Sequence, residues 1–598
     1  MHISYTVLYC ARVALLTAFL ASSVGHSAVA DEPAGSAPRS LFDGTSFAGW
    51  NGDTRHIWRI KDGAIVAGSP TAAAPRNEFL ATNRTFGDFE LRLEYRLDCG
   101  KDCNAGIQFR TARIPNHHEM IGYQADIGPG YDGCLYDESR RNVVLATPEK
   151  DALTQAIASA KDGWNEYVIR CEGRRIRLSI NGVETVDYTE TDATIPQEGV
   201  IALQIHGNMV GTIRYRNIRI QEFPPLLAAD FRRAPAAEGW EPSKSPVPFE
   251  GDTIRHANDP DEHGICIRKG QLMSTPFAVE PFAFYRLEFL AQASEKPLCA
   301  AVFLDKEGNE IVADDHDSID TCSDWRPYAL CFRGHADARQ ARIRLRANAG
   351  PLSVKNLRVK RITAADAAAW AAGLAAQCPT VQFEPAPDRW QFLPKTMQRL
   401  AAGGPLRIVM LGDSICNDTS NSLYETLLAR IYPKAKLEIV TSVRGGTGCW
   451  YYKDEGRVKS YVLDYKPDLV MIAGISHGFD VEAIRSVIRQ IRQGSNCEIL
   501  VMSGAIAPRE VFEPAHFHSK PAALALDDIE HFSPRMRRMC REERAEFFDI
   551  RRAWDDYMLR SYKPYDHFAR DTIHGNSRGK QIVARILAKY FEPKDAVR

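Results

Sequence analysis

The strongest constraint on the fold is a change of hydrophobic pattern near Leu406. From there on, near-continuous apolar segments alternate with amphipathic helical patterns such as SLYETLLARIY and DVEAIRSVIRQIRQG. Strands that are apolar on both faces and separated by helices form parallel sheets covered by helices on both sides. We therefore expect an α/β/α unit over residues 405–598, with strands at Leu406–Leu411, Leu437–Val443, Asp468–Ile475, Glu498–Gly504 and Ala545–Ile550.

The chain before this unit has the shorter, alternating pattern of half-buried antiparallel strands. In IRLSINGVETVDY, Asn181-Gly182 supplies the two positive-φ positions of a tight hairpin turn. We expect one β-sandwich over residues 40–223, a second over 224–363, and a helical linker over 364–404 that begins with the Ala-rich AADAAAWAAGLAAQ. A chain of 598 residues has room for such a multidomain arrangement.

The charge balance excludes one class of partner. Lys and Arg total 75 against 76 Asp and Glu, and no long basic run concentrates positive charge. Because a polyanion is held by a basic surface, we expect no nucleic-acid partner.

The N-terminus predicts export. Arg12 precedes an apolar run from Val13 to Val24, and Ala28-Val29-Ala30 forms a small-residue cleavage site. Residues 1–30 thus predict a signal peptide and a secreted or periplasmic protein that keeps no membrane span after cleavage. An N-terminal anchor is the alternative, but the apolar run is shorter than the about 20 residues of a membrane-spanning helix.

The cysteines indicate one local bridge. Fourteen are present, and removal of Cys10 with the leader leaves an odd number. Cys99 and Cys103 in CGKDC are the pair expected to bridge, with free buried thiols as the alternative. No second Cys or His pair with zinc-finger spacing follows, so we expect no metal or other cofactor.

The C-terminal unit contains a serine, a histidine and an aspartate at positions that suit nucleophilic catalysis by the serine. Ser414 follows the first apolar strand in LRIVMLGDSICND, and active residues of parallel sheets lie at the carboxyl ends of strands. A serine needs a base within reach, and the base needs an orienting carboxylate. Asp571 and His574 stand three residues apart before the last helical pattern, so one short loop can carry both. We predict Ser414, His574 and Asp571 as a catalytic triad.

Because of the Gly412-Asp413-Ser414 block and the closing Asp571-x-x-His574 block, the chain from about residue 406 to 591 resembles the SGNH, or GDSL-type, hydrolase family. The resemblance implies a flavodoxin-like fold. Aligning SVRGGTGCW with the family's second block implies that the oxyanion donors are Ser414, Gly448 and Ser476. Tyr451 and Tyr452, just after this block, either stack on a sugar ring or pack in the core.

The third block departs from the family pattern. It reads Gly474-Ile475-Ser476-His477, where the family carries G-x-N-D, so a serine hydroxyl replaces an asparagine amide as donor. We expect activity to be present but reduced, unless His477 takes part of the donor's role. The alternative for His477 is a loop histidine packed against the sheet edge.

The first sandwich resembles the 3-keto-disaccharide hydrolase family, a concanavalin-like fold, over about residues 40–223. Seven segments carry the likeness in order, among them LFDGTSFAGW, GDFELRLEYRL and IALQIHGNMVGTIRYRNIRI. The resemblance implies binding or cleavage of sugars, and polar residues on the strands are the candidate substrate-binding set: Asn104, Arg110, Tyr123, Gln124, Asp126, Gln204 and His206.

Two residues depart from this second family. Ala105 stands where serine is common, and Gln124 stands where glutamate is common. Because an amide cannot transfer protons, Asp126 and His206 remain the titratable pair. The alternative for Asn104 and Gln204 is that they satisfy buried backbone groups. The second sandwich looks like a carbohydrate-binding jelly roll, with a structural spacer as its alternative.

Together these features predict a secreted carbohydrate-active serine hydrolase, an esterase or deacetylase acting on acylated poly- or oligosaccharides. The alternatives are a glycosidase-type hydrolase of 3-keto-glycosides whose activity lies in the N-terminal sandwich, and a non-catalytic glycan-binding protein. The sequence predicts a carbohydrate substrate but leaves the individual glycan and the oligomeric state undefined.

Overall fold

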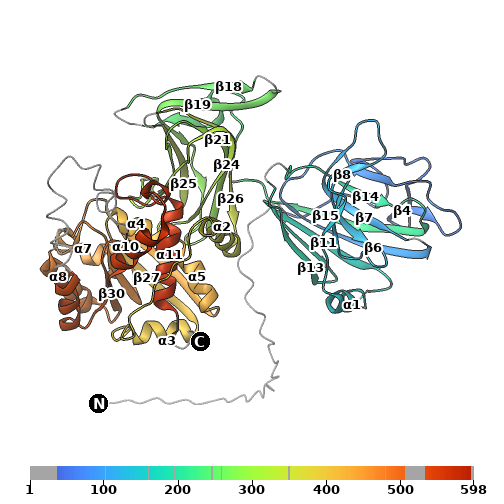
Figure 1. The fold of residues 1–598 in the computed structure, drawn as a ribbon. Coiled ribbons are helices and arrows are strands. Elements are labelled where there is room, and N and C mark those ends of the chain that lie inside the picture. The colour runs from blue at the N-terminus through green and yellow to red at the C-terminus, as the bar shows by residue number, and fades with distance from the viewer. Residues whose placement is uncertain are drawn as a thin grey trace, which may run out of the picture. The chain divides into compact units, whose positions relative to one another are not determined.

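The structure is a computed structural model that describes residues 37–593, apart from 102, 159, 193–194, 244–246, 257–258, 348–349, 478–479 and 506–532. The predicted signal peptide lies outside the described residues. Three regions follow one another along the chain, and Figure 1 colours them from blue through green to red: an N-terminal region (37–223), a middle region (224–363) and a C-terminal region (364–593).

The N-terminal region is an antiparallel sandwich. One sheet has the order β13-β12-β11-β6-β15-β4-β3, with β1 beside β15, and the other has the order β10-β9-β8-β7-β14-β5-β2. Large apolar side chains from both sheets form the core between them. The elements are β1 Arg39–Ser40, β2 Trp50–Asn51, β3 Arg59–Lys61, β4 Ala64–Ser69, β5 Glu78–Thr82, β6 Phe89–Lys101, β7 Ala105–Arg113, β8 Met120–Ile127, β9 Leu135–Glu138, β10 Val143–Ala146, α1 Lys150–Ala158, β11 Asn165–Glu172, β12 Arg175–Ile180, β13 Val183–Thr189, β14 Val200–Ile205 and β15 Val210–Glu222.

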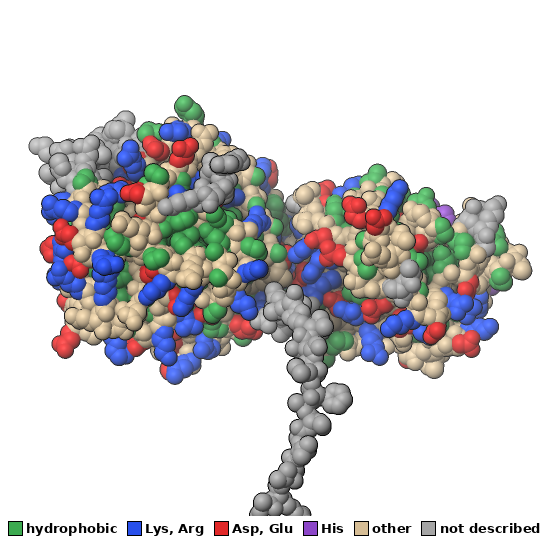
Figure 2. Space-filling view, turned by 90° about the horizontal axis from the view of Figure 1, so that it is seen from below, with side chains coloured by type: hydrophobic (Ala, Val, Ile, Leu, Met, Phe, Trp, Pro, Cys, Tyr) green, Lys and Arg blue, Asp and Glu red, His purple; other side chains and the backbone are tan. Residues whose placement is uncertain are grey.

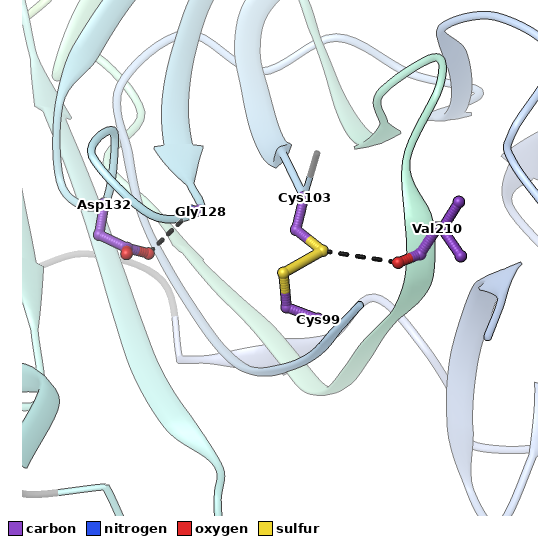
Figure 3. Close-up of a disulfide and its surroundings, with 5 residues drawn as sticks. All are labelled: Cys99, Cys103, Gly128, Asp132 and Val210. Carbon is purple, nitrogen blue, oxygen red and sulfur yellow. Dashed lines mark hydrogen bonds between the residues drawn. A yellow bond between two sulfur atoms is a disulfide. The ribbon is translucent and has the colours of Figure 1, made fainter. Parts of the chain in front are cut away.

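Two local predictions in this region are confirmed. The β12–β13 hairpin pairs Ile180 with Val183 across Asn181 and Gly182, which have φ of 51° and 82°. Cys99 and Cys103 form a disulfide at the end of β6 (Figure 3). The Cys103 disulfide sulfur also lies 3.8 Å from the Val210 carbonyl oxygen at the start of β15, so the bridge closes the β6–β7 turn against a neighbouring strand.

The middle region is a second antiparallel β-structure. Its long strand β19 pairs with β18 and β26 in its first part and with β17 and β25 in its second part, and so joins two layers around an apolar core. The elements are β16 Leu227–Ala229, η1 Pro235–Glu238, β17 Trp240–Pro242, β18 Glu250–His256, β19 Asp259–Ser274, β20 Phe277–Ala278, β21 Phe284–Ala293, β22 Leu298–Leu304, β23 Asp315–Ser318, β24 Cys322–Arg333, β25 Gln340–Ala347 and β26 Leu352–Ile362.

The C-terminal region contains a five-stranded parallel sheet in the order β28-β27-β29-β30-β31, as the alternating pattern predicts. Two separate apolar cores cover its faces, one with α5 and α11 and the other with α8. The elements are α2 Ala364–Ala376, α3 Pro394–Ala402, β27 Gly404–Gly412, α4 Ser414–Ser420, α5 Tyr424–Ile431, β28 Ala435–Val443, α6 Cys449–Tyr452, α7 Arg457–Tyr461, η2 Leu463–Tyr465, β29 Leu469–Ala473, α8 Val481–Gly494, β30 Glu498–Met502, β31 Glu546–Phe548, α10 Ile550–Ser561, η5 Tyr565–His567 and α11 Ser577–Phe591.

Side chains of both charge signs are spread over the face that Figure 2 shows. In Figure 2, Lys and Arg are interspersed with Asp and Glu over the visible face. None of the helices in the described ranges is both long and apolar enough to span a bilayer.

Candidate active site

The structure brings Ser414, His574 and Asp571 into one hydrogen-bonded chain. His574 Nε2 lies 2.8 Å from Ser414 Oγ, and His574 Nδ1 lies 2.9 Å from both carboxylate oxygens of Asp571. The imidazole therefore faces the hydroxyl on one side and a carboxylate on the other. This arrangement allows the ring to accept the serine proton while Nδ1–H stays bonded to the carboxylate.

Local structure explains why Ser414 stands where it does. Strand β27 ends at Gly412 at the carboxyl edge of the parallel sheet, and α4 begins at Ser414. Asp413 caps this helix, because its Oδ1 accepts from the N–H groups of Ile415 and Cys416. Ser414 is the first residue of the helix, so its own N–H is one of the unsatisfied donors of a helix N-terminus.

Asp571 is held in its ionised form. Burial opposes ionisation, but the His574 ring and the N–H groups of Ile573 and His574 donate to the carboxylate and lower its pKa to about 2. The Asp571 carboxylate therefore stays charged at neutral pH. The D-x-x-H spacing makes this possible, since one tight turn supplies the base, its orienting carboxylate and the backbone donors.

Asp413 also connects the nucleophile to the third block. Its Oδ2 accepts from the N–H groups of Ile475 and Ser476 at 2.7 and 2.6 Å. Gly474 has a φ of +124°, and a Cβ there would lie 2.4 Å from Asp413 Oδ1, so only glycine fits. Because the Ser476 N–H is already bonded, its hydroxyl is the group left to donate to an oxyanion.

Gly448 packs directly on Ser476. A Cβ at Gly448 would lie 2.2 Å from the Ser476 carbonyl oxygen, and Gly448 is followed at once by α6. Within the described part of the chain, the N–H groups of Ser414 and Gly448 have no acceptor. Of the residues predicted as oxyanion donors, Gly448 therefore lies against Ser476, and Ser476 is bonded to Asp413, the neighbour of Ser414.

The buried His477 ring holds the start of α6 next to the segment Gly474–His477. It is 4% exposed, burial lowers its pKa, and its Nδ1 accepts from the Cys449 N–H at 3.2 Å. A neutral ring that accepts at Nδ1 carries its proton on Nε2. The histidine thus packs inside the structure and fixes the start of α6 beside Gly448, which agrees with the packed-histidine interpretation.

A buried ion pair that sequence reasoning missed holds the histidine loop on the serine helix. Arg570 donates to both oxygens of Asp418 at 2.9 Å, and the Gly575 N–H donates to the same carboxylate at 3.0 Å. Asp418 lies on α4, whereas Arg570 and Gly575 flank the loop of Asp571 and His574. Asp418 and Arg570 lie 152 positions apart in the chain, so no local sequence pattern could have indicated their ion pair.

The aromatic residues after Gly448 have three different roles. Tyr452 is buried and donates to the Gly412 carbonyl oxygen at 2.6 Å, and the ring of Tyr451 lies under the Arg457 guanidinium. Trp450 is 46% exposed, and its Nε1 donates to the Ser476 carbonyl oxygen at 2.9 Å. Trp450, not the tyrosines, presents an oriented aromatic face at the rim of the site.

The N-terminal sandwich carries a separate polar face on the outside of the β7–β8–β14 sheet. Gln108 donates to Gln124 at 3.1 Å, and Gln124 donates to Asp126 at 2.7 Å. Gln204 lies on the same face, because Gly106 pairs with it on one side and with Asp126 on the other. The buried Gln204 amide has no hydrogen-bond partner among the residues that the structure describes. Burial raises the pKa of Asp126 to about 7.

One further carboxylate and an asparagine extend the description of this face. Glu138 on β9 pairs with Gly122 of β8 and was not predicted; burial and the charge of Glu119 raise its pKa to about 7. Asn104 is half-buried at the start of β7, and its carbonyl oxygen accepts from the His206 N–H. A strand-end carboxylate in CLYDE was the signal that could have identified Glu138.

Arg110 and Tyr123 correct the predicted substrate-binding set. Tyr123 faces the core between the two sheets, where its ring stacks on Phe109 and its hydroxyl donates to Glu190. A bulge turns Arg110 off the polar face, and its fully buried guanidinium pairs with Asp88. Neither side chain is available to a sugar on the polar face.

The described residues contain no group of three or more His, Cys, Asp or Glu side chains placed to hold a metal ion. The buried polar side chains of the N-terminal face are mainly amides and one carboxylate, a set that suits hydroxyl groups of a ligand.

Comparison with known proteins confirms the N-terminal resemblance. Residues 37–221 match the family model of the 3-keto-alpha-glucoside-1,2-lyase-like domain. No curated protein sequence matches the chain. Among solved structures, a carbohydrate-binding module from Bacillus subtilis is 15% identical, with 29% of this chain and 96% of that chain covered and a TM-score of 0.23.

Two esterase structures are also similar to parts of the chain. A catalytic mutant of an acetylxylan esterase from Geobacillus stearothermophilus is 17% identical, with 32% of this chain and 96% of that chain covered and a TM-score of 0.26. A two-domain esterase active on acetylated mannans is 18% identical, with 34% and 53% covered and a TM-score of 0.27.

Replacement of Asp418 by Asn should strongly destabilise the protein. It leaves the buried Arg570 guanidinium without its counter-charge, which typically costs about 3–5 kcal/mol. Urea unfolding of the full chain measures the loss. The control is Asp464→Asn, which breaks the exposed pair with Lys459 and should cost about 1 kcal/mol or less. Equal unfolding midpoints for the two variants would contradict this account.

Asp126→Asn should change how stability depends on pH. Because folding raises the Asp126 pKa to about 7, the carboxyl group favours the folded state fully below its unfolded pKa of about 4, and this contribution is lost as pH rises through 7. A shift of this size corresponds to about 4 kcal/mol. The melting temperature should fall less between pH 4 and pH 8 for Asp126→Asn than for the wild type. Asp252→Asn, at an exposed position, is the control and should behave like the wild type. Parallel pH profiles for all three proteins would sink the prediction.

Proposed function

We propose that this chain is an exported serine esterase that removes acyl groups, acetyl above all, from poly- or oligosaccharides. One observation carries the proposal: a single imidazole lies 2.8 Å from the Ser414 hydroxyl and 2.9 Å from both oxygens of the Asp571 carboxylate. Ester hydrolysis by a serine requires this relay of nucleophile, base and orienting carboxylate.

The reaction follows from the positions of these groups. Ser414 Oγ attacks the ester carbonyl carbon while its proton passes to His574 Nε2, and Asp571 stabilises the imidazolium through Nδ1–H. The negative oxygen of the tetrahedral intermediate is held by the N–H groups of Ser414 and Gly448 and by the Ser476 hydroxyl. His574 then protonates the leaving sugar alkoxide. Water attacks the acyl carbon on Ser414 while its proton passes to His574 Nε2, and the ring returns this proton to Ser414 Oγ as the acid leaves.

Two features support a carbohydrate as the alcohol part of the substrate. Trp450 presents a fixed, half-exposed aromatic face beside the oxyanion residues, and such a face can stack on a pyranose ring. The N-terminal region matches a family named for glucoside chemistry and is joined to the esterase in one chain. The predicted signal peptide would place the enzyme outside the cytoplasm, where such polysaccharides occur.

Release of acetate from acetylated xylan by the full chain tests the proposal. The wild type should release acetate, and Ser414→Ala should reduce the rate by at least about 1,000-fold, because loss of a triad member removes nearly all nucleophilic catalysis. Ser460→Ala, at an exposed serine of the same region, is the control and should keep the wild-type rate. Equal acetate release by wild type and Ser414→Ala would exclude this mechanism.

We propose a second, independent activity for the N-terminal polar face, namely binding and cleavage of a 3-keto-glycoside. The supporting observation is a buried carboxyl group, Asp126, whose pKa of about 7 suits proton transfer near neutral pH. Turnover of a 3-keto-glucoside should be lost in Asp126→Asn and unchanged in Ser414→Ala. Binding of the glycoside without turnover by the wild type would reduce this face to a binding site.

A further inference from the structure

The edge strand of the middle region is covered by the C-terminal region and not by another strand. β23 lies at the end of its sheet, where β22 is its one partner among the described strands, and yet Asp315 and Asp317 are 1% and 3% exposed. Unpaired strand edges and buried carboxylates both require partners. Here the partners come from α11, the helix that follows His574.

Asp317 fixes the first residue of α11. Its Oδ1 accepts from the Ser577 N–H at 2.8 Å and its Oδ2 accepts from the Ser577 hydroxyl at 2.6 Å. Tyr328 of the middle region donates to the same carboxylate at 2.7 Å and so holds it in place. A carboxylate at the N-terminus of a 15-residue helix is favoured both by hydrogen bonding and by the helix dipole.

A second contact extends this attachment by one helical turn. Lys580 of α11 is 2% exposed and donates to Asp315 at 2.5 Å and to the His316 carbonyl oxygen at 2.6 Å. Asp315 and Asp317 lie on the same face of β23 because successive strand residues alternate. Ser577 and Lys580 lie on the same face of α11 because they are three residues apart.

The same short segment also holds the helix of the nucleophile. Asn417 of α4 donates to the Asp314 carbonyl oxygen at 2.7 Å, and Asn421 donates to the same oxygen at 3.4 Å. Asn417 comes three residues after Ser414, and Ser577 comes three residues after His574. One segment of the middle region, Asp314–Asp317, is therefore bonded to the residues that come three positions after each of the two reacting side chains.

Further contacts anchor the two regions beyond this segment. Arg333 forms a buried ion pair with Glu425 and donates to the Ser420 carbonyl oxygen at the end of α4, at 3.2 Å. His335 Nε2 lies 2.7 Å from the Thr441 carbonyl oxygen of β28. Buried charge pairs of this kind are sensitive to geometry, so they define the relative position of the parts that they join.

We propose that the middle region is a working part of the catalytic centre, in which Asp317 is a positioning residue that sets the separation of Ser414 and His574. This inference rests on the proposed esterase function. Ser414 and His574 come from elements 160 residues apart, and a misplacement of about 1 Å between reacting groups can cost about 100-fold in rate. A segment bonded to both elements is in a position to prevent such a displacement.

Asp317→Ala in the full chain tests the proposal. With p-nitrophenyl acetate as substrate, kcat should decrease about 10- to 100-fold while KM changes less than about threefold, because the acyl-binding groups are untouched. The rate at which diisopropyl fluorophosphate modifies Ser414 should decrease in parallel. Asp317→Asn, which keeps one acceptor oxygen, should recover part of both rates.

The matched control is Asp320→Ala. Asp320 also joins the middle region to α11, through two 2.8 Å bonds from Arg578, but its side chain is 58% exposed. This variant should keep kcat within about twofold of the wild type, since an exposed ion pair contributes little. If Asp320→Ala and Asp317→Ala lower kcat equally, the effect is general loosening of the interface and the positioning role is overturned.

The remaining outcomes are equally distinct. A folded Asp317→Ala protein, with a melting curve like the wild type and unchanged kcat, overturns the inference while leaving the esterase function intact. If Asp317→Ala does not fold, Asp317→Asn and Ser577→Ala take its place, and unchanged kcat in both overturns the inference. A wild type that neither hydrolyses p-nitrophenyl acetate nor reacts with the fluorophosphate removes the proposed function, and the inference with it.

Discussion

The proposed chemistry of the C-terminal region depends on one short contact, the 2.8 Å hydrogen bond between Ser414 and His574. The two residues lie 160 positions apart. Ser414 follows the first strand of the parallel sheet along the chain, and His574 comes after the last strand. Three carboxylates keep these elements together: Asp413 bonds the serine turn to the third block, Asp418 bonds the serine helix to the histidine loop, and Asp317 bonds the following helix to the middle region. Each of these carboxylates accepts several hydrogen bonds from backbone, hydroxyl or cationic donors in place of water, which is the condition for burying a carboxylate.

Much of this framework could be predicted from the sequence, because it depends on local patterns. Apolar segments such as Leu406–Leu411 have no polar face and so must be covered on both sides, which indicates a parallel sheet and places Ser414 at its carboxyl edge. The spacing of Asp571 and His574 allows their direct bond. The Asn181-Gly182 turn is equally local, since its conformation is set by two residues.

What the sequence could not indicate arises from contacts between distant segments or from irregular backbone. The bulge beside Phe109 reverses the expected direction of Arg110, and nothing in NAGIQFR marks it. Tyr123 lies in a strand that is buried on both faces, so alternation alone could not tell its core side from its polar side. The Asp418–Arg570 pair and the attachment of Asp317 depend on tertiary structure, which is why they appear only with the fold.

The central claim is that Ser414 becomes acylated during ester hydrolysis, and rapid-quench mass spectrometry of the full chain mixed with an acetyl ester tests it most directly. The account predicts one acetyl group on the peptide that contains Ser414, formed within the first turnover, and its absence when His574 is replaced by Ala. Continued hydrolysis with no acetyl group on Ser414, or with acetylation of a different residue, would contradict the account.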